Sequence, residues 1–160
     1  MKINYTTVFK YPSFFVSTGF GIGLAPIAPG TFGSILGIVF FLLITHLYLS
    51  TFWMVMVLVA IFIISQISIS LTLKRIDETD PQEVVIDEVL GMMMTLTVIP
   101  LDPKWFLAAF IIFRVADIIK PWPASYFDET YKNALGIILD DVFAALYSII
   151  LLEILLAILV

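Results

Sequence analysis

Long apolar stretches without charge most constrain what this chain can fold into. The stretch 52–73 contains no charged side chain, and it ends at Lys74 and Arg75. A helix needs about 20 predominantly apolar residues to cross the hydrocarbon core of a bilayer. The composition agrees, because 61% of the residues are hydrophobic and only 13% are charged, against about 25% charged in water-soluble domains. We therefore expect a membrane protein.

Similar apolar segments recur along the whole chain. Asp80 and Asp102 each precede a proline, which is typical of a helix N-cap, and they are predicted to open the third and fourth helices. The sequence thus predicts an all-α, polytopic membrane helix bundle that forms a single domain over 1–160. Its spans are expected at about 33–49, 52–73, 81–99, 103–119 and 142–160.

The segment 13–33 differs from these spans. It gathers most of the chain's eight glycines, together with Pro26 and Pro29. A regular membrane helix would not tolerate them so close together, and irregular backbone at membrane depth survives only when buried in protein or lining a wet cavity. We expect a Gly/Pro-rich interfacial or re-entrant element, with a short helix before Gly19.

The basic residues predict a topology. If the N-terminus is cytoplasmic and five spans alternate, seven of the eight basic residues fall at cytoplasmic ends and only Lys104 lies outside, as the positive-inside rule expects. The same topology brings the main polar candidates to the cytoplasmic side, namely Thr31, Asp80, Asp87, Glu88, Asp117, Asp140 and Asp141. We therefore expect a multi-pass protein of a bacterial cytoplasmic (inner) membrane with its active site at the cytoplasmic face.

Several kinds of chemistry are excluded by residue counts. The chain contains no cysteine and one histidine, which excludes disulfides, thiolate nucleophiles and metal sites that need cysteine or two histidines. The net charge of −5 offers no basic patch for nucleic acid. Ionisable residues inside membrane helices cost roughly 2.5–3.5 kcal/mol each on insertion, so those present suggest function.

The ionisable residues favour metal-assisted phosphate chemistry. Asp87 and Glu88 lie in the third predicted helix, Arg114, Asp117 and Lys120 in or near the end of the fourth, and Asp140 and Asp141 open the last. Converging carboxylates suit Mg²⁺, and arginine with lysine suits a phosphate group. A structural ion network, or capping by one of the adjacent aspartates, is the plainer interpretation. These residues alone leave a phosphatase, a phosphotransferase and a divalent-cation channel open.

Four ordered motifs carry a resemblance to a known family. They are Thr18–Gly23 with Pro26 and Ala28–Ser34, Val85–Glu88 with Gly91, Phe113–Arg114 with Asp117–Ile118 and Lys120–Pro123, and Gly136–Ile137 with Leu139–Val142 and Ala144. In this order they resemble the bacterial phosphatidylglycerophosphatase A family. The resemblance implies magnesium-dependent removal of the terminal phosphate of phosphatidylglycerophosphate, a phospholipid in the bilayer, to give phosphatidylglycerol. Leu135 and Ala145 depart from the family's usual glycines.

The resemblance and the chemistry together suggest residue roles. The hypothesis assigns the metal to Asp87, Glu88, Asp140 and Asp141, the substrate phosphate to Arg114, Lys120 and Thr31, and catalysis to Asp87, Glu88, Arg114 and Asp117. Alternatives are a phosphatase of another lipid or isoprenoid phosphate and, in a different class, a divalent-cation transporter or channel. The oligomeric state is left open.

Overall fold

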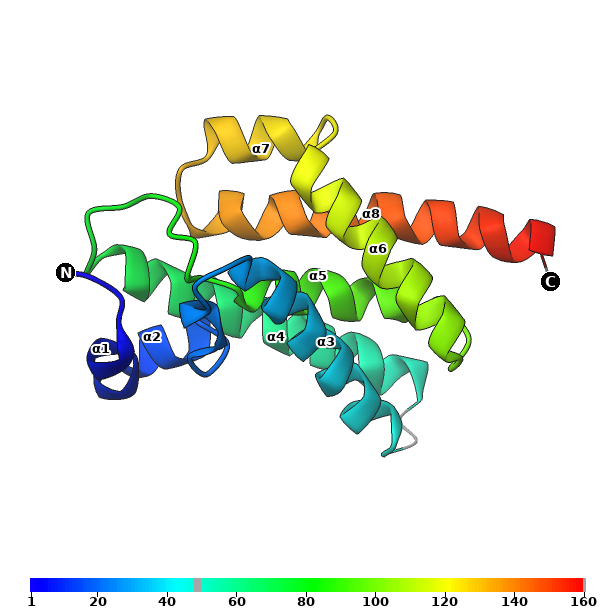
Figure 1. The fold of residues 1–160 in the computed structure, drawn as a ribbon, viewed down its shortest axis with the longest axis horizontal. Helices are drawn as coiled ribbons and strands as arrows, with labels where there is room; N and C mark the ends of the chain where they lie inside the picture. Colours follow the sequence, from blue (N-terminus) through cyan, green and yellow to red (C-terminus); the bar gives the residue numbers. More distant parts are fainter. Residues whose placement is uncertain (48–49, 160) are drawn as a thin grey trace.

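A computed structural model describes residues 1–47 and 50–159, and this part of the chain is helical without strands (Figure 1). The all-α prediction is confirmed. The helices are α1 (Tyr5–Lys10), α2 (Pro12–Ser17), the 3₁₀ helix η1 (Ile22–Leu24), α3 (Pro29–Thr45), α4 (Thr51–Leu73), α5 (Ile86–Leu96), α6 (Pro103–Ile119), α7 (Ala124–Thr130) and α8 (Ala134–Leu159).

Two helices, α4 and α8, are long and apolar enough to cross a membrane. They contain 23 and 26 residues, and only 17% and 22% of their most apolar windows are buried inside the molecule. A core helix of a water-soluble protein would be mostly buried, so this exposure indicates a membrane protein. α3 is apolar but shorter, with 17 residues. The number of five membrane segments is not confirmed and stays a prediction.

The short helix α5 forms the centre of the bundle. Most of its side chains are buried, and α3, α4, α6 and α8 all pack against it. The predicted helix over 81–99 is wrong in its bounds, because α5 has 11 residues and a length of about 16 Å. That is well short of the roughly 30 Å of a hydrocarbon core.

Tertiary contacts explain the late start of α5. The N-cap position is Val85, so the prediction that Asp80 caps this helix is wrong. The Val85 N–H donates to the Ser17 carbonyl at 2.9 Å. A Cβ on Gly23 would lie 1.9 Å from the Glu83 carbonyl oxygen. The segment before α5 is therefore held in a non-helical course by the end of α2 and by η1.

The predicted bounds of the fourth helix are confirmed, whereas the predicted start of the last helix is wrong. α6 begins and ends as predicted, and Asp102 caps it by accepting a hydrogen bond from the Lys104 N–H at 2.8 Å. α8 begins at Ala134 rather than at 142, because Asn133 Oδ1 accepts from the N–H groups of Leu135 and Gly136 at 3.0 and 3.1 Å. Asp140 and Asp141 thus lie within the helix and are not its caps. The predicted span ends at Leu49 and Val160 fall outside the described residues.

The Gly/Pro-rich segment is a tight turn followed by a helix start. A short helix, α2, precedes Gly19 as predicted. Gly19, Phe20 and Gly21 all have positive φ, which reverses the chain direction. Pro29 then occupies the first turn of α3, so residues 29–33 are helical rather than irregular.

Candidate active site

A polar cavity of about 400 Å³ lies where the starts of α3 and α5 meet the end of α6 and the first turns of α8. It is lined by Ala28, Pro29, Gly30, Asp80, Pro81, Gln82, Val84, Asp87, Glu88, Arg114, Asp117, Ile118, Lys120, Ile137, Asp140 and Asp141. The structure therefore brings together all of the predicted site residues except Thr31. Thr31 is half-buried and outside this lining, and its neighbour Gly30 lies at the cavity instead.

Three carboxylates form a cluster in this cavity. Asp87 and Glu88 lie in the first turn of α5, and Asp141 reaches them from α8. One oxygen of each lies within 4.8 Å of those of the other two. Close packing at Gly91 brings α8 this near, because a Cβ there would lie 3.1 Å from the Asp141 carbonyl oxygen.

The cluster has the properties of a cation site. Asp87 and Asp141 are buried. Asp87 Oδ1, Glu88 Oε2 and Asp141 Oδ2 are buried without a hydrogen-bond partner among the described residues. Unpaired buried carboxylates are costly unless a cation compensates them. Because all the donors are carboxylate oxygens, they fit a hard divalent cation such as Mg²⁺.

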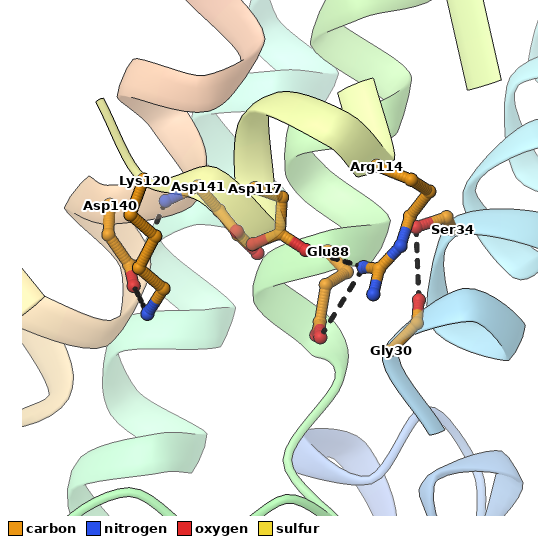
Figure 2. Close-up of polar contacts among 8 residues, drawn as sticks. All are labelled: Gly30, Ser34, Glu88, Arg114, Asp117, Lys120, Asp140 and Asp141. Atoms are coloured by element: carbon orange, nitrogen blue, oxygen red, sulfur yellow. Dashed lines mark hydrogen bonds and ion pairs between the residues drawn. The ribbon is translucent and has the colours of Figure 1, made fainter. Parts of the chain in front are cut away.

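Arg114 lies on the side of Glu88 that faces away from Asp141 (Figure 2). Its Nη1 is 2.6 Å from Asp117 Oδ2, three residues along α6, and 4.0 Å from Glu88 Oε1. The backbone of α3 closes this edge, because a Cβ on Gly30 would lie 2.2 Å from Glu88 Oε1 and 3.1 Å from Arg114 Nη1. The guanidinium is thus held by carboxylates at the cavity wall, next to the cluster.

Lys120 and Asp140 form a second ion pair, with 2.6 Å between Nζ and Oδ2 (Figure 2). Lys120 is the C-cap of α6 in the left-handed region, with φ of 47°. This conformation, followed by Pro121, ends the helix and lets the side chain reach α8. Asp140 therefore pairs with lysine beside the three-carboxylate cluster, and its role as a metal ligand stays a prediction.

The sequence did not single out several residues of the cavity. Gln82 was given no role, Ile118 stood in a family motif without a role, and Asp80 was predicted to cap a helix. They reach the cavity because the 80–84 segment is not helical and because the end of α6 lies across from it. No local signal in the sequence could have indicated this placement.

The fold and the cavity define a class of protein. It is a helical membrane protein whose cavity combines a carboxylate cluster with an arginine and a lysine side chain, and these groups suit phosphate chemistry. Residues 15–156 match the model of the family described as Phosphatidylglycerophosphatase A. The chain belongs to this family, as the sequence motifs suggested, and it is therefore an enzyme of the phosphatase class.

Curated relatives cover most of the chain. The phosphatidylglycerophosphatase A of Escherichia coli is 37% identical over 141 residues, which are 86% of this chain and 79% of the relative. The phosphatidylglycerophosphatase A of Haemophilus influenzae is 36% identical over 140 residues, 87% of this chain and 85% of the relative. A Bacteroides thetaiotaomicron protein, provisionally named as a phosphatidylinositol-3-phosphatase, is 35% identical over 153 residues, 91% of this chain and 96% of the relative. No solved structure shows a match.

Proposed function

We propose that this protein is a Mg²⁺-dependent phosphatase that hydrolyses the terminal phosphate monoester of phosphatidylglycerophosphate. The products are phosphatidylglycerol and phosphate. The observation that carries the proposal is the buried cluster of Asp87, Glu88 and Asp141, whose unpartnered oxygens lie at the same cavity as Arg114 and Lys120. Membership of the family and the names of two relatives support the choice of substrate.

The residues of the cavity divide the chemistry between them. Asp87, Glu88 and Asp141 would hold Mg²⁺, which supplies a Lewis acid for the phosphate and activates water when bound. Arg114 and Lys120 bind phosphate oxygens and stabilise the charge that grows on them as the bond to the glycerol oxygen breaks. Glu88 or Asp117 accepts the proton of the attacking water. Asp117 holds the Arg114 side chain in place and Asp140 holds that of Lys120, each through a 2.6 Å ion pair.

We propose that the protein is multi-pass in a bacterial cytoplasmic membrane, with the cavity at the cytoplasmic face. The supporting observation is the distribution of basic residues. The end of α4, which Lys74 and Arg75 follow, lies on the same side of the bundle as the N-terminus (Figure 1), and Lys120 ends α6 and lines the cavity. Lys104 lies at the opposite end, in the first turn of α6. The positive-inside rule favours this orientation, which puts the cavity at the headgroup level.

A second candidate substrate is another lipid phosphate monoester. The name of the Bacteroides relative favours a phosphoinositide, and that relative is nearly as similar to this chain as the other two. The same cavity chemistry would serve both lipids, because metal, arginine and lysine contact only the phosphate. The substrate must therefore be decided by comparing lipids directly.

The test is phosphate release by purified protein in detergent. Phosphatidylglycerophosphate, phosphatidylinositol-3-phosphate and a soluble phosphomonoester are compared, each with Mg²⁺ and with excess chelator. We expect release that requires Mg²⁺ and is fastest from phosphatidylglycerophosphate. Asp141→Asn removes this activity, whereas the control Asp102→Asn keeps it, because asparagine caps α6 as well as aspartate does. Faster release from phosphatidylinositol-3-phosphate would show that the phosphoinositide, and not phosphatidylglycerophosphate, is the preferred substrate. Release that persists in excess chelator would overturn the metal assignment.

A further inference from the structure

The side chain of Ile118 lies between the polar cavity and the exposed outer surface of α6. It lines the polar cavity with Asp117 and Lys120, yet it is 71% exposed. The other branched aliphatic side chains of the cavity wall, Val84 and Ile137, are 5% and 7% exposed. Ile118 is therefore the branched aliphatic side chain of the cavity wall that also faces the outside of the bundle.

An apolar stripe continues from Ile118 down the outer face of α6. Leu107 and Ile111 are 60% and 51% exposed, and spacings of seven and eleven residues place them on the same helix face as Ile118. Eleven residues of helix cover about 16 Å. The hydrocarbon of one leaflet is about half of a 30 Å core, so the stripe matches the depth of one leaflet.

A second apolar surface lies nearby but does not meet the cavity. It is a groove of about 450 Å³ between α6 and α8, lined by Ile119, Val115, Tyr147 and Leu151 among others, and it shares no lining residue with the cavity. Ile111 of the stripe also lines this groove, whereas Ile118 lines only the cavity. A lipid whose phosphate lies at the carboxylate cluster therefore leaves the cavity at Ile118, where the stripe meets the cavity, and not through a direct opening into the groove.

We propose that the lipid substrate enters the cavity sideways from the bilayer across Ile118, and that this side chain contacts the part of the lipid that joins the headgroup to the acyl chains. This inference rests on the proposed function, because it requires a lipid phosphate in the cavity. Ile118 is then a residue that determines specificity for membrane-embedded over water-soluble phosphomonoesters. It takes no part in bond breaking, so its replacement affects binding of the lipid more than turnover.

Two neighbouring isoleucines provide a matched test. Ile119 is 68% exposed, close to the 71% of Ile118, but it lines the groove. Ile118→Asn and Ile119→Asn are compared on dioleoyl phosphatidylglycerophosphate in mixed micelles and on its water-soluble dibutyryl analogue. We expect Ile118→Asn to raise KM for the dioleoyl lipid about tenfold, with kcat unchanged and with the dibutyryl analogue unaffected. Ile119→Asn leaves both substrates unchanged.

Other results would overturn the inference. An equal rise in KM for both variants would show a general effect of polarity on α6, and a rise for Ile119→Asn alone would place the acyl chains in the groove. The milder pair Ile118→Ala and Ile119→Ala repeats the comparison where an asparagine variant fails to fold. Failure of the unmodified protein to release phosphate from any lipid would instead overturn the proposed function, and the inference with it.

Discussion

Two adjacent aspartates show how position within a helix separates roles. Asp140 and Asp141 are chemically identical and differ by one residue, which is about 100° around a helix. Asp141 consequently joins the cluster with Asp87 and Glu88, whereas Asp140 turns to Lys120 at 2.6 Å. In our proposal Asp141 holds the metal, and Asp140 positions the lysine that binds phosphate.

The first prediction separates these two roles. Asp141→Asn is expected to lower activity by at least about 100-fold and to raise the Mg²⁺ concentration needed for half-maximal activity, because it removes a ligand. Asp140→Asn is expected to raise KM for the lipid without changing the Mg²⁺ requirement, because it weakens the ion pair that positions Lys120. Mg²⁺ titrations of both variants test this. Equal shifts in the Mg²⁺ requirement would make Asp140 a ligand as well.

The second prediction concerns Gly30 at the edge of the site. A Cβ there would lie 2.2 Å from Glu88 Oε1 and 3.1 Å from Arg114 Nη1, so Gly30→Ala must displace both groups. The end of a glutamate side chain moves at little cost in stability, but a misplacement of about 1 Å can lower activity about 100-fold. We expect low activity with an almost unchanged Tm. Full activity would show that Glu88 is not needed where the structure places it.

At the scale of elements, the packing of α3 against α5 positions the start of both helices at the cavity. A Cβ on Gly37 would lie 2.8 Å from the Val89 carbonyl oxygen, and one on Gly33 would lie 2.9 Å from that of Val85. These neighbours are backbone atoms, which cannot turn aside as a side chain can. The two helices lie this close because both positions are glycine.

The third prediction follows from this packing. Gly37→Ala is expected to destabilise the protein by about 1–3 kcal/mol, because the helices must separate to accept the methyl group. Thermal unfolding in detergent measures the change, and Gly30→Ala serves as the comparison on the same helix. A Tm equal to that of the unmodified protein would mean that α3 and α5 are less closely packed than described.

For the whole molecule, the separation of polar and apolar surface determines its orientation. The described part of α4 and α8 presents mainly apolar side chains to the outside. The N-terminus and the end of α4 lie toward one end of the bundle, and the connection between α5 and α6 lies toward the other (Figure 1). The cavity is lined from the starts of α3 and α5, the end of α6 and the first turns of α8. A bilayer around the middle would leave both ends in water.

The fourth prediction tests the orientation. The sequence contains no cysteine, so a single introduced thiol reports its own side of the membrane. Glu78 and Leu101 are both exposed and lie outside the helices. Their segments, the α4–α5 and α5–α6 connections, lie toward opposite ends of the bundle (Figure 1). A membrane-impermeant thiol reagent is expected to label Leu101→Cys in intact cells and Glu78→Cys in inverted vesicles. The reverse pattern would place the cavity outside the cytoplasm.

Local signals predicted some elements well. The bounds of α6 agree with the sequence because Asp102 and Pro103 start the helix and Lys120 and Pro121 end it within a few residues. The start of α5 could not be predicted in the same way. The Val85 N–H before it donates to the carbonyl of Ser17 at the end of α2, 68 positions earlier in the chain, and no local pattern reports such a contact.

The sequence alone determined the helical class, the apolar lengths that suit a bilayer, the family, and the residues that carry the candidate chemistry. Those properties depend on residue type and on spacing over a few turns. Only the tertiary structure decided that Asp141 rather than Asp140 meets Asp87 and Glu88, and that Gly30 rather than Thr31 lies at the cavity. The direction of a side chain depends on how helices far apart in the chain pack, and one residue of shift turns it by about 100°.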